Sequence, residues 1–210
     1  MKTTKIIAIL AISALLCSCG ATEKTEFKCV APMPAAIDVA NLQDCMVPAT
    51  FKLSDFNWEE GSLSMEVSNK DLYDAVEISQ LQVGDTLIYD DAPIVIQKIE
   101  QTQKGVEING GQIDEGGCSL MANEGGTYVA CHWDTHATYT DLGKAQVPLA
   151  KDFIIIDCGE DPNDPSDTIR TDQKRYIENL KGGRDSFFCL NTLVTIEKGK
   201  ITQINRRWIP

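Results

Sequence analysis

The stretch SLSMEVS, residues 62–68, decides the fold class of this chain because apolar and polar side chains alternate along it. Successive side chains of a β-strand point to opposite faces, so the three apolar residues would share one face and pack on a core. They are Leu63, Met65 and Val67. The same pattern precedes the stretch at Phe51 and Leu53, and residues 57–61 have the composition of a turn. Residues 49–68 therefore predict an antiparallel hairpin.

Outward from this hairpin, short apolar runs and period-two patterns continue to the C-terminus, separated by turns rich in glycine. Further strands are expected at 76–78, 86–89, 94–99, 106–108, 129–133, 147–149, 153–156, 193–197 and 201–209. The best helix candidate is 171–180, with Thr171 as its N-cap and Gly182-Gly183 as its terminator. About ten strands with one short helix near the C-terminus predict a mainly β fold, either an antiparallel β-barrel or a β-sandwich.

The first twenty residues have the features of an export signal. Lys2 and Lys5 precede an apolar run, residues 6–16, which is too short to span a bilayer because a spanning helix needs about 20 residues. The residues LCSC at 16–19 resemble the lipobox of bacterial lipoproteins, which has a leucine, a small residue directly before the cut, and then a cysteine. The resemblance implies cleavage before Cys19 and a lipid anchor on that residue.

These features predict three parts of the chain. Residues 1–18 form the signal peptide, residues 19–34 a flexible lipidated tether, and residues 35–210 a mainly β globular domain with room for two subdomains. An aspartate after the anchor would resemble an inner-membrane retention signal, but Gly20 follows Cys19. We therefore expect an outer-membrane lipoprotein of the cell envelope that faces either the periplasm or the cell exterior.

The charge of the chain argues against nucleic acid as a partner. Thirty-one acidic side chains against 19 basic ones give a formal net charge of −12. Such a surface repels phosphate backbones and anionic lipid head groups, so we expect membrane contact through the lipid alone. The sequence also lacks the P-loop, the G-x-S-x-G motif of serine esterases and the H-E-x-x-H motif of zinc proteases.

Six cysteines follow the anchor residue. They are Cys29, Cys45, Cys118, Cys131, Cys158 and Cys189. An even number in an exported chain predicts at least one disulfide. Bridges between neighbours in sequence, Cys29 with Cys45 and Cys118 with Cys131, are the expected ones. The alternative is that several are small buried residues with free thiols. No pair has C-x-x-C spacing, which argues against a thioredoxin-like motif and zinc-ribbon knuckles.

Both histidines of the chain lie in the segment CHWDTH, residues 131–136. If this segment is a strand, His132, Asp134 and His136 share one face and form a candidate metal site, because imidazole and carboxylate groups ligate zinc and non-haem iron. The alternative is that these three residues are the solvated side of an amphipathic strand. The acidic loop 160–167 offers oxygen ligands for calcium but lacks the EF-hand order, which favours a solvated turn region.

The motifs that are present indicate where the protein is sent and assign no activity, which favours a non-enzymatic role without a cofactor. We expect a membrane-anchored binding or envelope-assembly module whose partner is another envelope protein or a carbohydrate. The alternative is an envelope hydrolase that uses a metal held by His132, Asp134 and His136, or a pair of carboxylates as in glycosidases.

Overall fold

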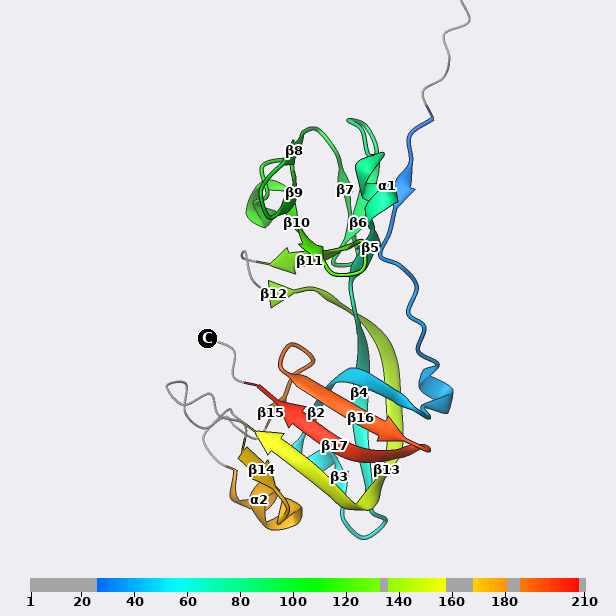
Figure 1. Cartoon of the computed structure of the whole chain (residues 1–210), viewed down its shortest axis with the longest axis vertical. Helices are drawn as coiled ribbons and strands as arrows, with labels where there is room; N and C mark the ends of the chain where they lie inside the picture. The colour runs from blue at the N-terminus through cyan, green and yellow to red at the C-terminus, as the bar shows by residue number, and fades with distance from the viewer. Residues whose placement is uncertain (1–25, 133–135, 158–167, 181–185, 208–210) are drawn as a thin grey trace, which may run out of the picture.

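The computed structural model describes residues 26–132, 136–157, 168–180 and 186–207. Strands dominate these residues, which confirms the mainly β prediction. They build two lobes, one above the other in Figure 1, and each lobe has its own cluster of buried apolar side chains. We call the lobe formed between residues 71 and 138 the insert lobe, and the other the barrel lobe.

Five strands of the barrel lobe form a closed ring. They are β2 (Cys45–Lys52), β4 (Ser62–Lys70), β13 (Tyr139–Asp157), β16 (Thr192–Glu197) and β17 (Lys200–Arg206). Around the ring the order is β2, β4, β13, β17, β16 and back to β2. Only β13 and β17 are parallel neighbours in this ring. This order, with a helix between the third and fourth ring strands, is the topology of the OB fold, a five-stranded Greek-key barrel. Of the two predicted architectures, this lobe adopts the barrel.

β13 closes the ring because it pairs with two different strands along its length. Its first part, from Tyr139 to Pro148, lies beside β4, and its second part, from Leu149, lies beside β17. The register with β4 shifts between Asp141 and Gly143, and Gly143 has a φ of +114° there. Glycine adopts this φ without the steric cost that a side chain would bring. The 19-residue strand can therefore curve around the core.

Inward-facing side chains of the five strands fill the barrel, and the three apolar residues of the stretch 62–68 are among them. Three short strands flank the ring: β3 (Phe56–Asn57), β14 (Thr168–Arg170) and β15 (Ser186–Phe187). Helix α2 (Gln173–Asn179) packs Tyr176 and Ile177 into the same core. This confirms the predicted helix near the C-terminus, although its N-cap is Asp172 and not Thr171.

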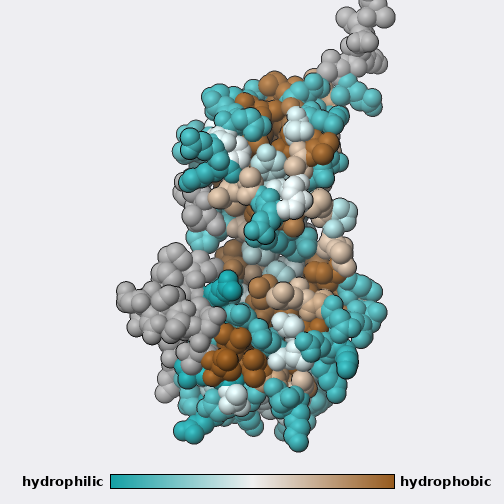
Figure 2. Space-filling model, in the orientation of Figure 1, coloured by the Kyte–Doolittle hydropathy of each residue, from teal (hydrophilic) through white to brown (hydrophobic). Residues whose placement is uncertain are grey.

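The apolar run 153–156 differs from its prediction as a strand buried on both faces. Phe153 and Ile155 point into the core, whereas Ile154 and Ile156 remain partly exposed on the outer surface. Ile156 lies opposite Ile169 of β14, which is 61% exposed. The surface of the barrel lobe is largely hydrophilic in Figure 2 but carries an apolar patch. All four residues of the run are apolar because the outward-facing side chains, like the inward-facing ones, are apolar.

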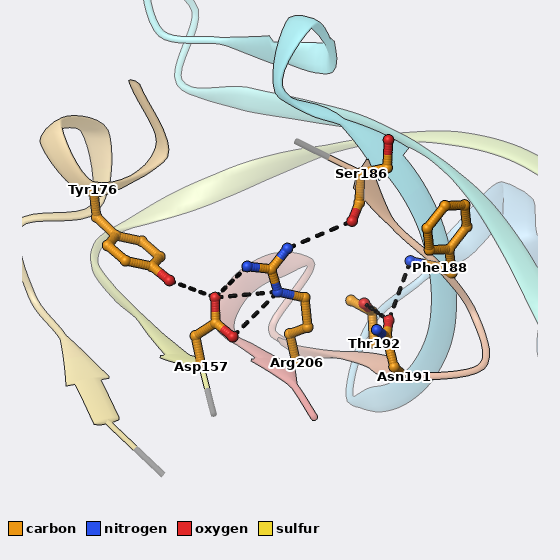
Figure 3. A network of polar contacts seen from close by, with 7 residues as sticks. All are labelled: Asp157, Tyr176, Ser186, Phe188, Asn191, Thr192 and Arg206. Atoms are coloured by element: carbon orange, nitrogen blue, oxygen red, sulfur yellow. Dashed lines mark hydrogen bonds and ion pairs between the residues drawn. The ribbon is translucent and has the colours of Figure 1, made fainter. Parts of the chain in front are cut away.

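A buried polar network joins α2 to β13 and β17 (Figure 3). Arg206 Nε lies 3.2 Å from Oδ1 and 3.1 Å from Oδ2 of Asp157, and the Tyr176 hydroxyl donates to the same carboxylate. The guanidinium also lies over the Phe187 ring, 4.3 Å from its centroid. Asp157 is 1% exposed and Arg206 is 4% exposed. The ion pair therefore compensates two charges that burial keeps away from solvent.

The insert lobe is formed by the chain between the second and third ring strands. Its strands are β5 (Leu72–Asp74), β6 (Thr86–Tyr89), β7 (Ala92–Val95), β8 (Ile99–Gln101), β9 (Gly105–Ile108), β10 (Cys118–Asn123), β11 (Thr127–His132) and β12 (His136–Ala137). One sheet has the order β12, β11, β10, β9, β8, with β5 also paired to β11. A smaller sheet joins β6 and β7 to β1 (Cys29–Val30), near the start of the described chain. The region predicted as one domain, 35–210, thus contains two hydrophobic cores.

Helix α1 (Ala75–Ser79) occupies a segment for which the sequence predicted a strand. The carboxylate of Asp74 accepts hydrogen bonds from the backbone N–H groups of Val76 and Glu77. These bonds satisfy donors that the first helical turn leaves free, and they outweigh the β preference of Val76 and Ile78. The strand prediction was wrong because it weighed the apolar residues and overlooked the cap.

Part of the segment predicted as a flexible tether, residues 19–34, is packed against the insert lobe. Val30 in β1 is 6% exposed and belongs to the insert-lobe core. Phe27 lies against Gly84, where a Cβ atom would come within 2.1 Å of the phenyl ring. After β1 the chain runs along both lobes to the 3-10 helix η1 (Val39–Asn41) beside the barrel (Figure 1). At least part of the predicted tether is therefore packed structure.

Asp71 forms hydrogen bonds at the point where the chain passes from the barrel lobe to the insert lobe. It is 1% exposed, and its Oδ1 accepts a 2.7 Å hydrogen bond from the Thr140 hydroxyl. Its backbone N–H donates to the carbonyl of Thr138, and its own carbonyl accepts from the N–H of Ala130. The outgoing and returning strands are therefore bonded to each other through this residue.

Candidate functional site

The sequence predicted that both histidines lie on one strand. In the structure they lie on two antiparallel strands of a hairpin. β11 ends at His132 and β12 begins at His136, and these two residues are direct cross-strand partners. His132 Nε2 lies 3.2 Å from Asp90 Oδ2, and its ring meets the Tyr89 ring edge-on at 5.6 Å between centroids. The prediction that both histidines share one face of a single strand is wrong, because the chain reverses between them. The reversal nevertheless places the two histidines opposite each other on neighbouring strands.

Asp134, the third predicted metal ligand, lies outside the described residues. Within the described ranges, no group of three or more His, Cys, Asp or Glu side chains is close enough to hold a metal ion. Cys19, Cys158 and the acidic loop 160–167 also lie outside those ranges. The predictions of a three-ligand metal site, of lipidation and of a calcium loop therefore stay predictions.

The structure corrects both predicted disulfides, because all four cysteines concerned have free thiols. Cys29 belongs to the sheet of β6 in the insert lobe, whereas Cys45 lies in the barrel ring. Ser119 is the cross-strand partner of Cys131. Cys118, one residue earlier on the same strand, therefore points to the opposite face from Cys131. Cys189 likewise has a free thiol.

Burial governs the chemistry of the cysteines inside the insert lobe. Cys118 is fully buried, and desolvation raises the pKa of its thiol to about 12. Desolvation also raises the pKa of Cys131, against smaller lowering effects of Lys70 and a backbone hydrogen bond from Met121. Neither thiol has the lowered pKa of an activated nucleophile. The earlier alternative of small buried residues with free thiols describes these two cysteines.

Two adjacent hollows lie on the outer surface of the barrel lobe, and we call them together the barrel groove. The two hollows share Asp55 and Ser64. The larger hollow encloses about 590 Å³. The smaller hollow is further lined by Thr50, Phe51, Lys52, Met65, Glu66, Lys144, Ser186 and Phe188, and the larger one by Ser54, Phe56, Asn57, Trp58, Glu59, Gln146 and Lys174.

The floor of the barrel groove is polar because outward side chains of three adjacent ring strands meet there. Thr50 of β2 lies opposite Glu66 of β4, and Glu66 lies opposite Lys144 of β13. Lys144 Nζ is 3.2 Å from Glu66 Oε1. Two residues further along β13, Gln146 lies opposite Ser64. Apolar and polar side chains alternate along each strand. The apolar ones point into the core, and the polar ones point outward and form this floor.

The wall of the groove is the connection between β2 and β4, and local hydrogen bonds fix its shape. Asp55 Oδ2 accepts a 2.7 Å bond from the N–H of Lys52, and Asn57 Oδ1 accepts a 3.1 Å bond from the N–H of Glu60. Trp58 stacks on the buried Phe56, with ring centroids 4.9 Å apart and an angle of 7° between the planes. The half-buried indole thus lines the groove from a fixed position.

Each hollow contains one accessible aromatic side chain, Trp58 in the larger and Phe188 in the smaller. Phe188 is 51% exposed. Sequence reasoning missed both residues because the groove joins segments from β2 to α2 that are far apart in the chain. The available signal was Trp58 itself, an aromatic residue inside the polar turn predicted at 57–61.

Comparisons with known proteins add no family to this description. No protein family model matches the chain, and no curated protein or solved structure is significantly similar to it. In the described part of the chain, no helix has the length and apolar character needed to cross a membrane.

Proposed function

We propose that this protein is a membrane-anchored, non-catalytic envelope module that binds a linear oligosaccharide in the barrel groove. The observation that carries the proposal is the groove itself, which has one accessible aromatic side chain in each hollow and polar side chains between them. The membrane anchor rests on the lipobox resemblance at residues 16–19. The carbohydrate partner rests on the chemistry of the groove.

A sugar chain matches this surface in two ways. The faces of pyranose rings present C–H groups that pack on aromatic rings such as Trp58 and Phe188, while the ring edges carry hydroxyls that can exchange hydrogen bonds with groups such as Gln146. OB folds bind oligosaccharides or oligonucleotides on the face of their second and third strands, which here are β4 and β13. The OB fold by itself assigns no ligand, but the aromatic and polar side chains of this groove suit a sugar chain. The net charge of −12 disfavours the oligonucleotide.

Three carboxylates line the groove, those of Asp55, Glu59 and Glu66, and two of them already have partners, which favours binding over glycoside hydrolysis. A glycosidase needs two carboxyl groups that are available to an acid and to a nucleophile or base. Asp55 accepts the backbone N–H of Lys52, and Glu66 pairs with Lys144. Both groups therefore already serve the wall or the floor of the groove.

The proposal is tested by screening the purified full-length protein against fragments of envelope polysaccharides. For a fragment that binds, we expect Trp58→Ala and Phe188→Ala each to raise Kd about tenfold, equivalent to about 1.4 kcal/mol. Trp58→Phe should retain most of the affinity because it keeps a ring at the site. Val83→Ala, at an exposed position of the insert lobe, is the control and should leave Kd unchanged. Failure of all fragments to bind, or a Kd that both alanine variants leave unchanged, would overturn the proposal.

A further inference from the structure

The chain contains two histidines, and the fold places them directly opposite each other at the end of the β11–β12 hairpin. Directly paired residues of antiparallel strands point to the same face and have Cβ atoms roughly 4.5–5.5 Å apart. Both histidines are partly exposed, so solvent and ions can reach this face. This spacing allows two imidazole rings to approach one ion together.

Two neighbours orient the ring of His132. Its Nε2 lies 3.2 Å from Asp90 Oδ2, and Tyr89 packs edge-on against it. The Tyr89 hydroxyl donates a 2.8 Å hydrogen bond to the carbonyl of Cys131, so this neighbour is itself held in place. A carboxylate that accepts the proton of one ring nitrogen leaves the lone pair of the other nitrogen available. Histidine ligands of metals are commonly supported in this way.

Asp90 reaches His132 from a separate hairpin. Asp90 and Asp91 form the turn between β6 and β7, and both have positive φ values, 48° and 58°. Aspartate and asparagine tolerate this backbone conformation better than other residues with side chains. The turn therefore positions a carboxylate beside the histidine, and an Asp→Asn change can remove the charge while it keeps the turn.

We propose that His132 and His136 chelate one late divalent transition-metal ion, with Asp90 orienting His132 through its Nε2 atom. Two imidazoles supply only part of a coordination shell, and water completes it. Imidazole nitrogen suits copper, nickel and zinc, and the general order of affinity places Cu²⁺ above Ni²⁺ and Zn²⁺. The site lies on the insert lobe and is independent of the barrel groove.

The test is calorimetric titration of the full-length protein with Cu²⁺, Ni²⁺ and Zn²⁺ salts in a weakly coordinating buffer. We expect one ion per chain, bound most tightly for Cu²⁺, and at least a tenfold loss of Cu²⁺ affinity in His132→Ala and in His136→Ala. Asp90→Asn should weaken binding about tenfold through the orientation of His132. Asp91→Asn is the matched control, because it changes the same turn and the same charge, and it should bind as the unchanged protein does.

A second measurement avoids dependence on variants that fold poorly. Electron paramagnetic resonance of the Cu²⁺-loaded, unchanged protein should show coupling to two imidazole nitrogens. A spectrum with oxygen ligands only would overturn the proposal, as would histidine variants with unchanged affinity. An equal loss of affinity in Asp91→Asn and Asp90→Asn would overturn the orienting role of Asp90.

Discussion

Cys118 and Cys29 carry the same thiol in opposite surroundings. Cys118 points into the insert-lobe core and is fully buried, whereas Cys29 on β1 is exposed. Burial disfavours the charged thiolate, so the folded protein keeps the Cys118 proton until the pH approaches about 12. Reactivity toward alkylating agents should differ accordingly, because the thiolate is the nucleophile.

We predict that iodoacetamide at pH 9 labels Cys29 within minutes and leaves Cys118 unlabelled until the protein unfolds, as measured by mass spectrometry of tryptic peptides. Because the unfolded chain releases the Cys118 proton near the ordinary thiol pKa of about 8.5 and the folded chain does not, stability should fall as the pH rises above that value. The control is the same labelling in denaturant, where both peptides should react. Rapid labelling of Cys118 in the folded protein would contradict its burial.

Helix α2 illustrates how a short element depends on its attachments. It has only seven residues, which is too few for a stable isolated helix. Tyr176 and Ile177 fix it to the barrel core, and the Tyr176 hydroxyl ties it to the ion pair of Asp157 and Arg206. The helix, β13 and β17 should therefore lose stability together when this pair is broken.

We predict that Arg206→Met lowers the free energy of unfolding by about 3–5 kcal/mol, because it removes the ion pair and the hydrogen bonds that Arg206 gives to the buried Asp157 carboxylate. Urea denaturation followed by circular dichroism measures the change. Arg207→Met is the matched control, since Arg207 is the next residue and is exposed; its effect should stay within about 0.5 kcal/mol. Similar losses in the two variants would refute the role of the network.

Local patterns predict the hairpins of this protein well and its long-range pairing poorly. The hairpin of β16 and β17 and the strands at residues 49–68 follow from alternation and turn composition. No local pattern could predict that β13 pairs with β4 over one half and with β17 over the other. Sequence separation also hid the groove, because Trp58, Gln146 and Lys174 meet only after the barrel closes. The histidine pair was predicted as a site but with the wrong backbone geometry.

For the whole molecule, the lipobox resemblance gives a direct prediction. Cys19→Ala should release the protein from the membrane fraction or leave its signal peptide uncleaved, whereas Cys17→Ala should change little. The reason is that Ser18 is a small residue before Cys19, while the bulky Leu16 precedes Cys17. Incorporation of radiolabelled palmitate measures the difference, and equal incorporation into the Cys19→Ala variant would exclude Cys19 as the anchor.

The pairing of β1 with β6 determines how far the protein can stand from a membrane that holds Cys19. Nine residues lie between Cys19 and Cys29, and such a segment spans at most about 30–36 Å when fully extended. This short segment would therefore keep the insert lobe close to the lipid surface. The barrel lobe lies at the other end of the molecule from β1 (Figure 1). The insert lobe would then act as a spacer that carries the groove outward, toward polymers too bulky to approach the bilayer.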